Sequence, residues 1–221
     1  MTIISSISYS IPVFYFILTK KISEYSKKNE IILNNDYIRL YNICLSSISL
    51  LILINCSIQS VNHGLIDILC NSYVDNIEIE RYTFLILKIV EWTDTILLII
   101  KNKGDMKKIS NIHYYHHAIV PTMTYYGLYQ PGEIYVLISN SLAHFLMYLY
   151  YAFPKELKRI KYSITLYQYI QHLLALILIL TQHMNNCKIN YPLINTLGYM
   201  YFFYEYLLLI FKNLKTNSKI N

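Results

Sequence analysis

The chain has 221 residues, of which 55% are hydrophobic and 14% are charged. A soluble domain has about 25% charged residues, so this composition excludes an ordinary soluble protein and indicates an integral membrane protein. The formal net charge is +6, but the basic residues lie between apolar runs. We therefore interpret the charge as a determinant of membrane orientation, and expect no nucleic-acid partner.

Seven apolar runs are long enough, or nearly long enough, to cross a bilayer. The first is short and the fourth contains Pro121, and a packed bundle tolerates both. We interpret the first run as a span, since a signal peptide would need basic residues ahead of it and a clear cleavage site. The sequence therefore predicts an all-α membrane protein, one domain over residues 1–221, with spans at about 3–19, 40–61, 82–100, 111–129, 134–152, 163–184 and 194–211.

The basic residues predict how these spans are oriented. Sixteen of the nineteen Lys and Arg residues lie after the first, third, fifth and seventh spans, whereas the opposite loops contain only Arg81 and Lys188. Lys88 lies inside a span. Because basic loops face the cytosol, we expect a lumenal or external N-terminus and a cytosolic C-terminus.

Polar residues recur at helical spacing in the predicted cytosolic halves of spans three to six. In span four, the histidines of the segment HYYHH fall within about one third of the helix circumference. Histidines near a membrane boundary are costly unless they serve a site. We expect the four spans to direct these residues at one cavity: Lys88, Glu91 and Asp94; His113, His116 and His117; Asn140, His144, Tyr148 and Tyr151; and Thr165, Gln168, Gln171 and His172.

Each group also has a purely structural interpretation. The charged residues of span three could form a buried ion network, and His144 could be a hydrogen-bonded packing residue. The glutamines of span six could join helices, and the tyrosines could fill the core. Convergence of all four groups favours a site over these separate explanations.

Four motifs, in this order and at this spacing, resemble those of the fatty acid elongase (ELO) family of the endoplasmic reticulum. They match the family's KxxExxDT element, its histidine box, its NxxxHxxMYxYY element and its TxxQxxQ element. The HxYHH form of the box looks like the branch that acts on saturated and monounsaturated chains. The matching segments are KIVEWTDT (Lys88–Thr95), HYYHH (His113–His117), NSLAHFLMYLYY (Asn140–Tyr151) and TLYQYIQ (Thr165–Gln171).

The resemblance implies a very-long-chain 3-oxoacyl-CoA synthase in the endoplasmic reticulum membrane. Such an enzyme condenses an acyl-CoA with malonyl-CoA and releases CO₂ and CoA, with no metal or other cofactor. Its partners would be these two substrates, the lipid bilayer, and the ketoreductase, dehydratase and enoyl reductase of the cycle. The apolar faces do not predict an oligomeric state.

None of the four cysteines is placed to serve as a nucleophile at the predicted site, which favours an imidazole. By resemblance we assign His116 as the acyl carrier, tuned by His113 and His117, and expect Asp94 to orient the imidazole. His144, with Asn140, would polarise the second thioester. The expected substrate-binding residues are Lys88, Glu91, Asn140, Tyr148, Tyr151, Gln168, Gln171 and Lys161.

The CoA phosphates would meet Lys161, Lys101 and Lys103 at the cytosolic mouth. In this sequence Tyr162 stands where family members often have a second lysine. A C16 acyl tail is about 20 Å long and would run towards the lumen in an enclosed tunnel within a hydrocarbon layer of about 30 Å. Cys70 and Cys187 both fall in predicted lumenal loops, so a disulfide between them is a hypothesis.

Two other functions fit parts of the pattern. A membrane di-iron desaturase or hydroxylase also carries HxxHH boxes, but it requires about eight histidines. This chain has seven, and His63 and His183 are predicted to be lumenal. A non-enzymatic seven-span receptor or transporter would use the buried charges for a signal or a substrate pathway. Metal analysis tests the first function, and a search for an acyl adduct tests the second.

Overall fold

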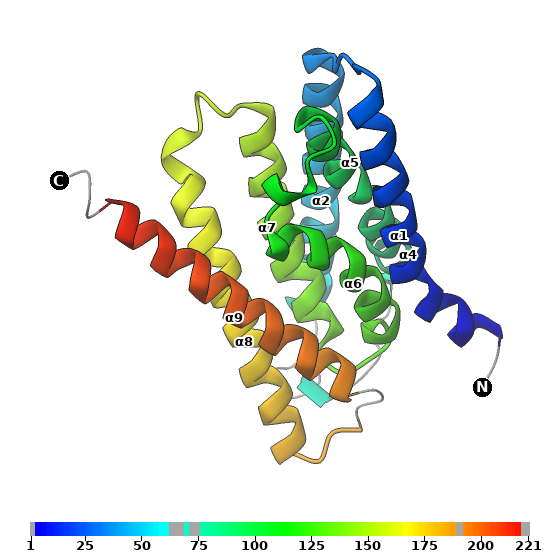
Figure 1. Cartoon of the computed structure of the whole chain (residues 1–221). Helices are drawn as coiled ribbons and strands as arrows, with labels where there is room; N and C mark the ends of the chain where they lie inside the picture. The colour runs from blue at the N-terminus through cyan, green and yellow to red at the C-terminus, as the bar shows by residue number, and fades with distance from the viewer. Residues whose placement is uncertain (1–2, 62–68, 71–75, 189–191, 218–221) are drawn as a thin grey trace.

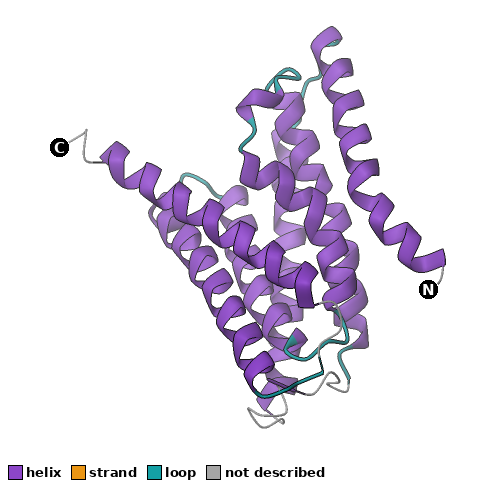
Figure 2. Ribbon diagram, turned by 60° about the horizontal axis from the view of Figure 1, so that its bottom comes forward, coloured by secondary structure: helices purple, strands orange, loops and turns teal. Residues whose placement is uncertain are grey.

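The structure, a computed structural model, describes residues 3–61, 69–70, 76–188 and 192–217. His63 lies outside this part of the chain. The described residues form helices joined by loops and contain no strand, as predicted (Figure 2). The elements are α1 (Ile3–Lys28), α2 (Asn35–Val61), α4 (Glu78–Val90), α5 (Trp92–Lys101), η1 (Met106–Lys108), α6 (Asn111–Gly127), α7 (Glu133–Ala152), η2 (Lys158–Ile160), α8 (Lys161–Met184) and α9 (Pro192–Asn217).

Each of the seven predicted segments is helical, and the third is divided into α4 and α5. Two of the described helical segments, Asn35–Val61 and Lys158–Met184, are long and apolar enough to cross a membrane by length and composition. Among the others, α6 has 17 residues, and α4 and α5 are shorter, contain Lys88 and Asp94, and are separated by Glu91. That all seven segments cross a membrane therefore stays a prediction.

The loops 29–34, 102–110 and 153–160 lie at one end of the bundle, and the loop 128–132 lies at the opposite end (Figure 1). The loops 102–110 and 153–160 contain Lys103, Lys107, Lys108, Lys155 and Lys158, and Lys27, Lys28, Lys101 and Lys161 lie in the helical turns next to the loops at this end. The basic residues thus gather on one side of the molecule, as the sequence predicts. Which compartment this side faces is a prediction from charge alone.

Two polar contacts and an apolar cluster fix α7 against α2 and α4. The buried Arg81 forms an ion pair with Glu133 at the start of α7, and Ser46 donates to the backbone oxygen of Phe145 at 3.0 Å. The largest apolar cluster includes Leu45, Ile52, Phe84, Leu87, Ile134 and Leu137 from the same three helices. Gly132, before α7, has a φ of +80°, and an added Cβ there would lie 2.6 Å from Nε2 of Gln182.

Helix α6 is held between two further clusters. Ala118 packs with Tyr15 of α1 and Trp92 of α5, whereas Met123 packs with Phe202 and Tyr206 of α9. The helix begins after Ser110, whose hydroxyl accepts a hydrogen bond from the backbone N–H of His113 at 3.4 Å. Serine is a favoured residue at this position because it pairs an otherwise unpaired backbone donor.

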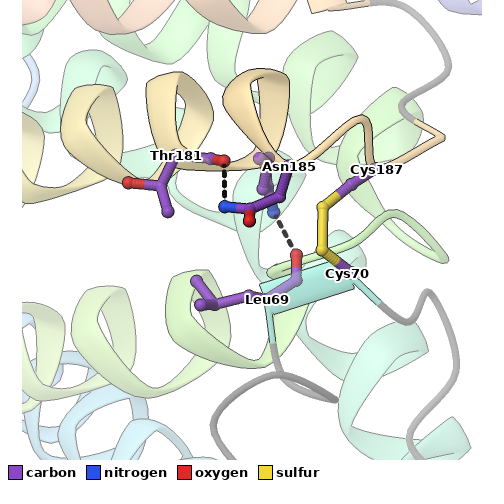
Figure 3. Close-up of a disulfide and its surroundings, with 6 residues drawn as sticks. Leu69, Cys70, Thr181, Asn185 and Cys187 are labelled. Atoms are coloured by element: carbon purple, nitrogen blue, oxygen red, sulfur yellow. Dashed lines mark hydrogen bonds between the residues drawn. A yellow bond between two sulfur atoms is a disulfide. The ribbon is translucent and has the colours of Figure 1, made fainter.

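The structure pairs Cys70 with Cys187 in a disulfide, with the two Cα atoms 5.0 Å apart (Figure 3). This confirms the pairing proposed from the sequence. Next to it, the side chain of Gln182 donates to the backbone oxygen of Leu69 at 2.9 Å. The segment preceding α4 is thus joined to the end of α8 by a covalent bond and a hydrogen bond.

We predict that Cys70→Ser lowers the free energy of unfolding by about 2–4 kcal/mol, because the bond joins residues 117 positions apart and restricts the unfolded chain. The measurement is the apparent melting temperature of the purified protein in detergent. Cys70→Ser/Cys187→Ser should melt like the single variant, and Cys44→Ser, at an exposed position on α2, should melt like the unmodified protein. Equal melting of all four proteins would contradict the prediction.

Candidate functional site

The site is built around Glu91, the single residue that separates α4 from α5. The backbone N–H of Glu91 donates to Leu87 at 2.8 Å, while that of Asp94 donates to Glu91 at 3.0 Å. The second bond spans three residues, a tighter turn than the α-helix makes. The three charged residues all make contacts with α7: Lys88 with Asn140, Glu91 with His144 and Asp94 with Tyr148.

Lys88 and Glu91 form a buried ion pair that reaches α7. The ammonium nitrogen of Lys88 lies 3.0 Å from Oε1 of Glu91 and 2.7 Å from Oδ1 of Asn140. It also lies 3.3 Å from Nε2 of His144, and Nδ1 of His144 lies 3.0 Å from Oε1 of Glu91. Four residues predicted from two motifs thus form one network.

His116 stands at the edge of this network. Glu91, His116 and His144 each offer one ligand atom, and these atoms lie within 4.8 Å of one another. Such spacing suits a divalent cation, but the Lys88 ammonium already lies against the Glu91 oxygen. Nδ1 of His116 is buried and has no hydrogen-bond partner among the described residues, and the same is true of Nδ1 of His117 and His144. An imidazole nitrogen with no competing contact is free to react with a ligand.

The other two histidines of the box are engaged by α5. The hydroxyl of Tyr15 donates to Thr95 at 2.9 Å, and Oγ1 of Thr95 lies 3.1 Å from Nε2 of His113. The indole N–H of Trp92 donates to the backbone oxygen of His117 at 2.8 Å. That oxygen is available because Pro121, four residues further on, has no N–H to offer it.

Asp94 was expected to orient the imidazole of His116, but it forms no hydrogen bond with the histidine box. Its two carboxylate oxygens accept hydrogen bonds from the hydroxyls of Tyr41, at 3.0 Å, and Tyr148, at 2.6 Å. The carboxylate beside an imidazole is that of Glu91, which approaches His144. Asp94 lies one turn beyond Glu91, where the tyrosine hydroxyls already occupy both of its carboxylate oxygens.

Two cavities approach the box from different sides. The inner cavity is narrow, with a volume of ≈ 90 Å³, and its polar wall includes Lys88, His116, Asn140 and Gln171. The outer cavity is wide, with a volume of ≈ 1330 Å³, and Asp94, His113 and Tyr151 line it. The basic residues around the outer cavity are Lys27, Lys28, Arg39, Lys101, Lys103, Lys155 and Lys161.

Of the remaining predicted residues, Gln171 lines the inner cavity and Tyr151 the outer one, whereas Tyr148 and Gln168 line neither. Gln168 points its amide nitrogen at Sδ of Met147, 3.9 Å away. His172 lines the inner cavity, as its spacing on span six predicts, although the sequence interpretation gave it no catalytic or binding role. Its Nδ1 lies 2.6 Å from the backbone oxygen of Gln168. The sequence interpretation missed the contact of Trp92 with the backbone of His117, although the position of Pro121 is a sequence signal for a free carbonyl there.

We predict that Thr95→Val lowers the free energy of unfolding by about 1–3 kcal/mol, because it removes the hydroxyl that the buried Tyr15 and His113 share. Thermal melting of Thr95→Val, Tyr15→Phe and the double variant is the measurement. The double variant should lose less than the sum of the single losses. Thr181→Val, whose hydroxyl donates to Ile177 at an exposed site, is the matched control. If the double variant loses as much stability as the two single variants together, the three groups are not coupled.

Comparison with known proteins gives a consistent result. The model of the family described as ELO: GNS1/SUR4 family matches residues 3–214. "Putative fatty acid elongase 4" of Caenorhabditis elegans is 31% identical over 153 residues, which are 65% of this chain and 51% of that protein. "Very long chain fatty acid elongase 1" of Homo sapiens is 31% identical over 130 residues, 54% of this chain and 46% of that protein. "Fatty acid elongase A" of Dictyostelium discoideum is 28% identical over 145 residues, which are 62% of this chain and 52% of that protein. The chain spans about half the length of the curated relatives it matches.

Proposed function

The chain belongs to the GNS1/SUR4 (ELO) family, and from this premise we propose that it is a fatty acid elongase, a very-long-chain 3-oxoacyl-CoA synthase. It condenses an acyl-CoA with malonyl-CoA to give a 3-oxoacyl-CoA, CO₂ and CoA. The observation that carries the proposal is the meeting of Lys88 of α4, His116 of α6, His144 of α7 and Glu91, which follows α4, beside a narrow cavity.

In the first step a nitrogen of His116 attacks the acyl thioester carbonyl. The carbon–sulfur bond breaks, an acyl-imidazole forms, and the CoA thiolate takes the proton that the imidazole loses. Two observations support His116 for this role: it lines the inner cavity, and its Nδ1 is buried without a partner among the described residues. His113 and His117 flank it and hold the helix in place through their contacts with α5.

In the second step malonyl-CoA loses CO₂ and leaves an enolate at the thioester. The enolate carbon attacks the acyl-imidazole carbonyl, the new carbon–carbon bond forms, and the imidazole leaves and regains a proton. Asn140 and His144 are proposed to stabilise the enolate oxygen. The chemistry requires no metal, because decarboxylation supplies the carbanion. The position of Asn140 in the inner cavity wall supports this part of the proposal.

The acyl tail is proposed to lie in the inner cavity. Its wall follows α6 from His116 to Gly127, about 16 Å of helix rise, and α8 from His172 to Gln182. Between these ends the wall is largely apolar, with Val120, Met123, Ala175 and Leu178 among its residues, which suits an alkyl chain. We favour saturated and monounsaturated chains on the form of the histidine box.

The CoA portion is proposed to bind in the outer cavity. Its basic residues suit the phosphates of CoA. Lys161, Lys101 and Lys103, expected at this mouth from the sequence, all line it. Tyr151, Asp94 and the box residue His113 also line this cavity. Tyr148, Gln168 and Gln171 would support the walls around the reacting groups.

We place the protein in the endoplasmic reticulum membrane, with seven spans, a lumenal N-terminus and a cytosolic C-terminus. Disulfides persist in oxidising compartments, so the end that carries the Cys70–Cys187 bond suits the lumen, and the basic loops at the opposite end suit the cytosol. The ketoreductase, dehydratase and enoyl reductase of the cycle are the proposed companions.

We predict that the purified protein, incubated with a long-chain acyl-CoA alone, releases CoA and forms an adduct on the peptide that contains His116. Peptide mass spectrometry detects the adduct, and later addition of malonyl-CoA yields 3-oxoacyl-CoA. His116→Ala should lose the adduct and at least about 1000-fold of kcat, because it removes the nucleophile. His183→Ala, an exposed histidine on α8, is the control and should keep both.

The outcomes separate the parts of this proposal. Condensation without release of CoA before malonyl-CoA is added would contradict the two-step reaction. Retained activity in His116→Ala would remove the nucleophile but leave the condensation. Absence of 3-oxoacyl-CoA with the unmodified protein would contradict the function itself.

We also predict that Lys101→Ala/Lys103→Ala/Lys161→Ala raises the KM for acyl-CoA about tenfold at nearly unchanged kcat, because three contacts to phosphate are lost away from the reacting groups. The matched control Lys107→Ala/Lys108→Ala/Lys158→Ala removes the same charge from exposed residues outside the outer cavity wall. Equal KM values in the two triple variants would contradict a phosphate site in the outer cavity.

A further inference from the structure

Lys88 is a buried cation whose hydrogen-bonding capacity is fully used. Its side chain is 2% exposed. Its nitrogen lies within 3.3 Å of Oδ1 of Asn140, Oε1 of Glu91 and Nε2 of His144. An ammonium group has three N–H donors and no lone pair. Each of the three atoms it contacts must therefore act as an acceptor.

This requirement decides the state of His144. A neutral imidazole that accepts at Nε2 carries its proton on Nδ1. Nδ1 lies 3.0 Å from Oε1 of Glu91 but makes no hydrogen bond with it. The contact of Lys88 with Nε2 therefore decides the tautomer. The rings of His116, His117 and Tyr148 are the other titratable groups near it.

The same requirement decides the orientation of Asn140. Because its oxygen accepts from Lys88, its NH₂ group must point away from the ammonium. Asn140 lines the inner cavity, and its N–H donors are the part of the side chain left for a ligand there. A donor in this position suits the oxygen of a thioester or an enolate.

Lys88 also supplies a positive charge where a metal would fit by spacing. Glu91, His116 and His144 could surround a divalent cation, but that cation would compete with the ammonium for the same oxygen of Glu91. Two cations a few ångströms apart in a buried site repel each other strongly. The lysine is therefore the cation of this site, and unlike a metal it brings directed N–H donors.

We propose that Lys88 is a positioning residue, which fixes the Nδ1–H tautomer of His144 and turns the N–H donors of Asn140 towards the inner cavity. The proposal rests on the condensation proposed above and gives Lys88 a role in it. The alternative is that Lys88 only neutralises the charge of Glu91. The two explanations differ in what should happen when both charges are removed together.

The first test is ¹⁵N NMR of the protein labelled on its histidine rings, with His144→Asn used to identify the signals of His144. The unmodified protein should show a protonated Nδ1 and a bare Nε2. Glu91→Gln should keep this state, because Lys88 remains and the substituted amide can turn its oxygen towards Nδ1. Lys88→Met/Glu91→Gln, which leaves the net charge unchanged, should give a mixture of tautomers.

Two results would overturn the proposal. One is a protonated Nε2 with a bare Nδ1 in the unmodified protein, a result that needs no variant to fold. The other is the same tautomer in Glu91→Gln and in Lys88→Met/Glu91→Gln. Lys88→Arg/Glu91→Gln keeps the donors at position 88 and should keep the bare Nε2, and circular dichroism with thermal melting checks that each variant is folded.

The second test is kinetic. Asn140→Asp keeps an acceptor for Lys88 but removes the N–H donors, and it should lower kcat about 100-fold with little change in KM. Lys88→Met/Glu91→Gln should lower kcat by a similar factor, whereas full activity of this charge-neutral variant would support charge balance as the only role. Because the NMR result does not depend on turnover, an unmodified protein with the expected tautomer but no product would contradict the proposed function and leave the positioning intact.

Discussion

A buried ammonium and carboxylate one helical turn apart constrain everything around them. Removing two charges from water costs several kcal/mol per ion, and the cost is recovered only when their remaining donors and lone pairs are also paired. Lys88 and Glu91 obtain these partners from α7, through Asn140 and His144. A shift of α7 along α4 would break these contacts, so the pair fixes the relative position of the two helices. The Arg81–Glu133 ion pair also fixes α4 against α7, at the first residue of α7.

The histidine box is positioned partly through a backbone carbonyl group rather than through an ion pair. Pro121 leaves a carbonyl oxygen free at His117, and Trp92 pairs with it. On the same face Thr95 pairs with His113. Phe202 of α9 packs on His116 from the other side, with ring centroids 4.9 Å apart. The contacts differ in kind: α5 holds the ring of His113 and the backbone oxygen of His117, whereas the ring of His116 meets an aromatic ring and lines the inner cavity. Helical periodicity alone places the three histidines on one face and does not distinguish them.

Much of the fold follows from the sequence because apolar run length and charge distribution act locally. The seven helical segments and the cysteine pair were predictable for that reason. The exchange of Asp94 for Glu91 beside the imidazole was missed because both carboxylates recur at three-residue steps, and helical spacing does not say which of them reaches His144. The relay from Tyr15 through Thr95 joins residues 80 positions apart, and the first span carries no motif that marks it. Such contacts depend on how helices pack, which no local pattern specifies.

The contrast between the two cavities bears on the order of the proposed reaction. Both substrates end in the same CoA group, and of the two cavities the outer one carries the basic lining that suits phosphates. If both substrates use this mouth, the first CoA has to leave before the second enters. The acyl group must then stay behind on the protein, which requires a covalent bond or a very tightly held tail. A narrow cavity that begins at His116 provides for both, because the nucleophile and the apolar wall belong to the same space. The wide outer cavity with its basic residues and the narrow, largely apolar inner cavity thus favour an acyl-histidine intermediate over direct transfer between two bound thioesters.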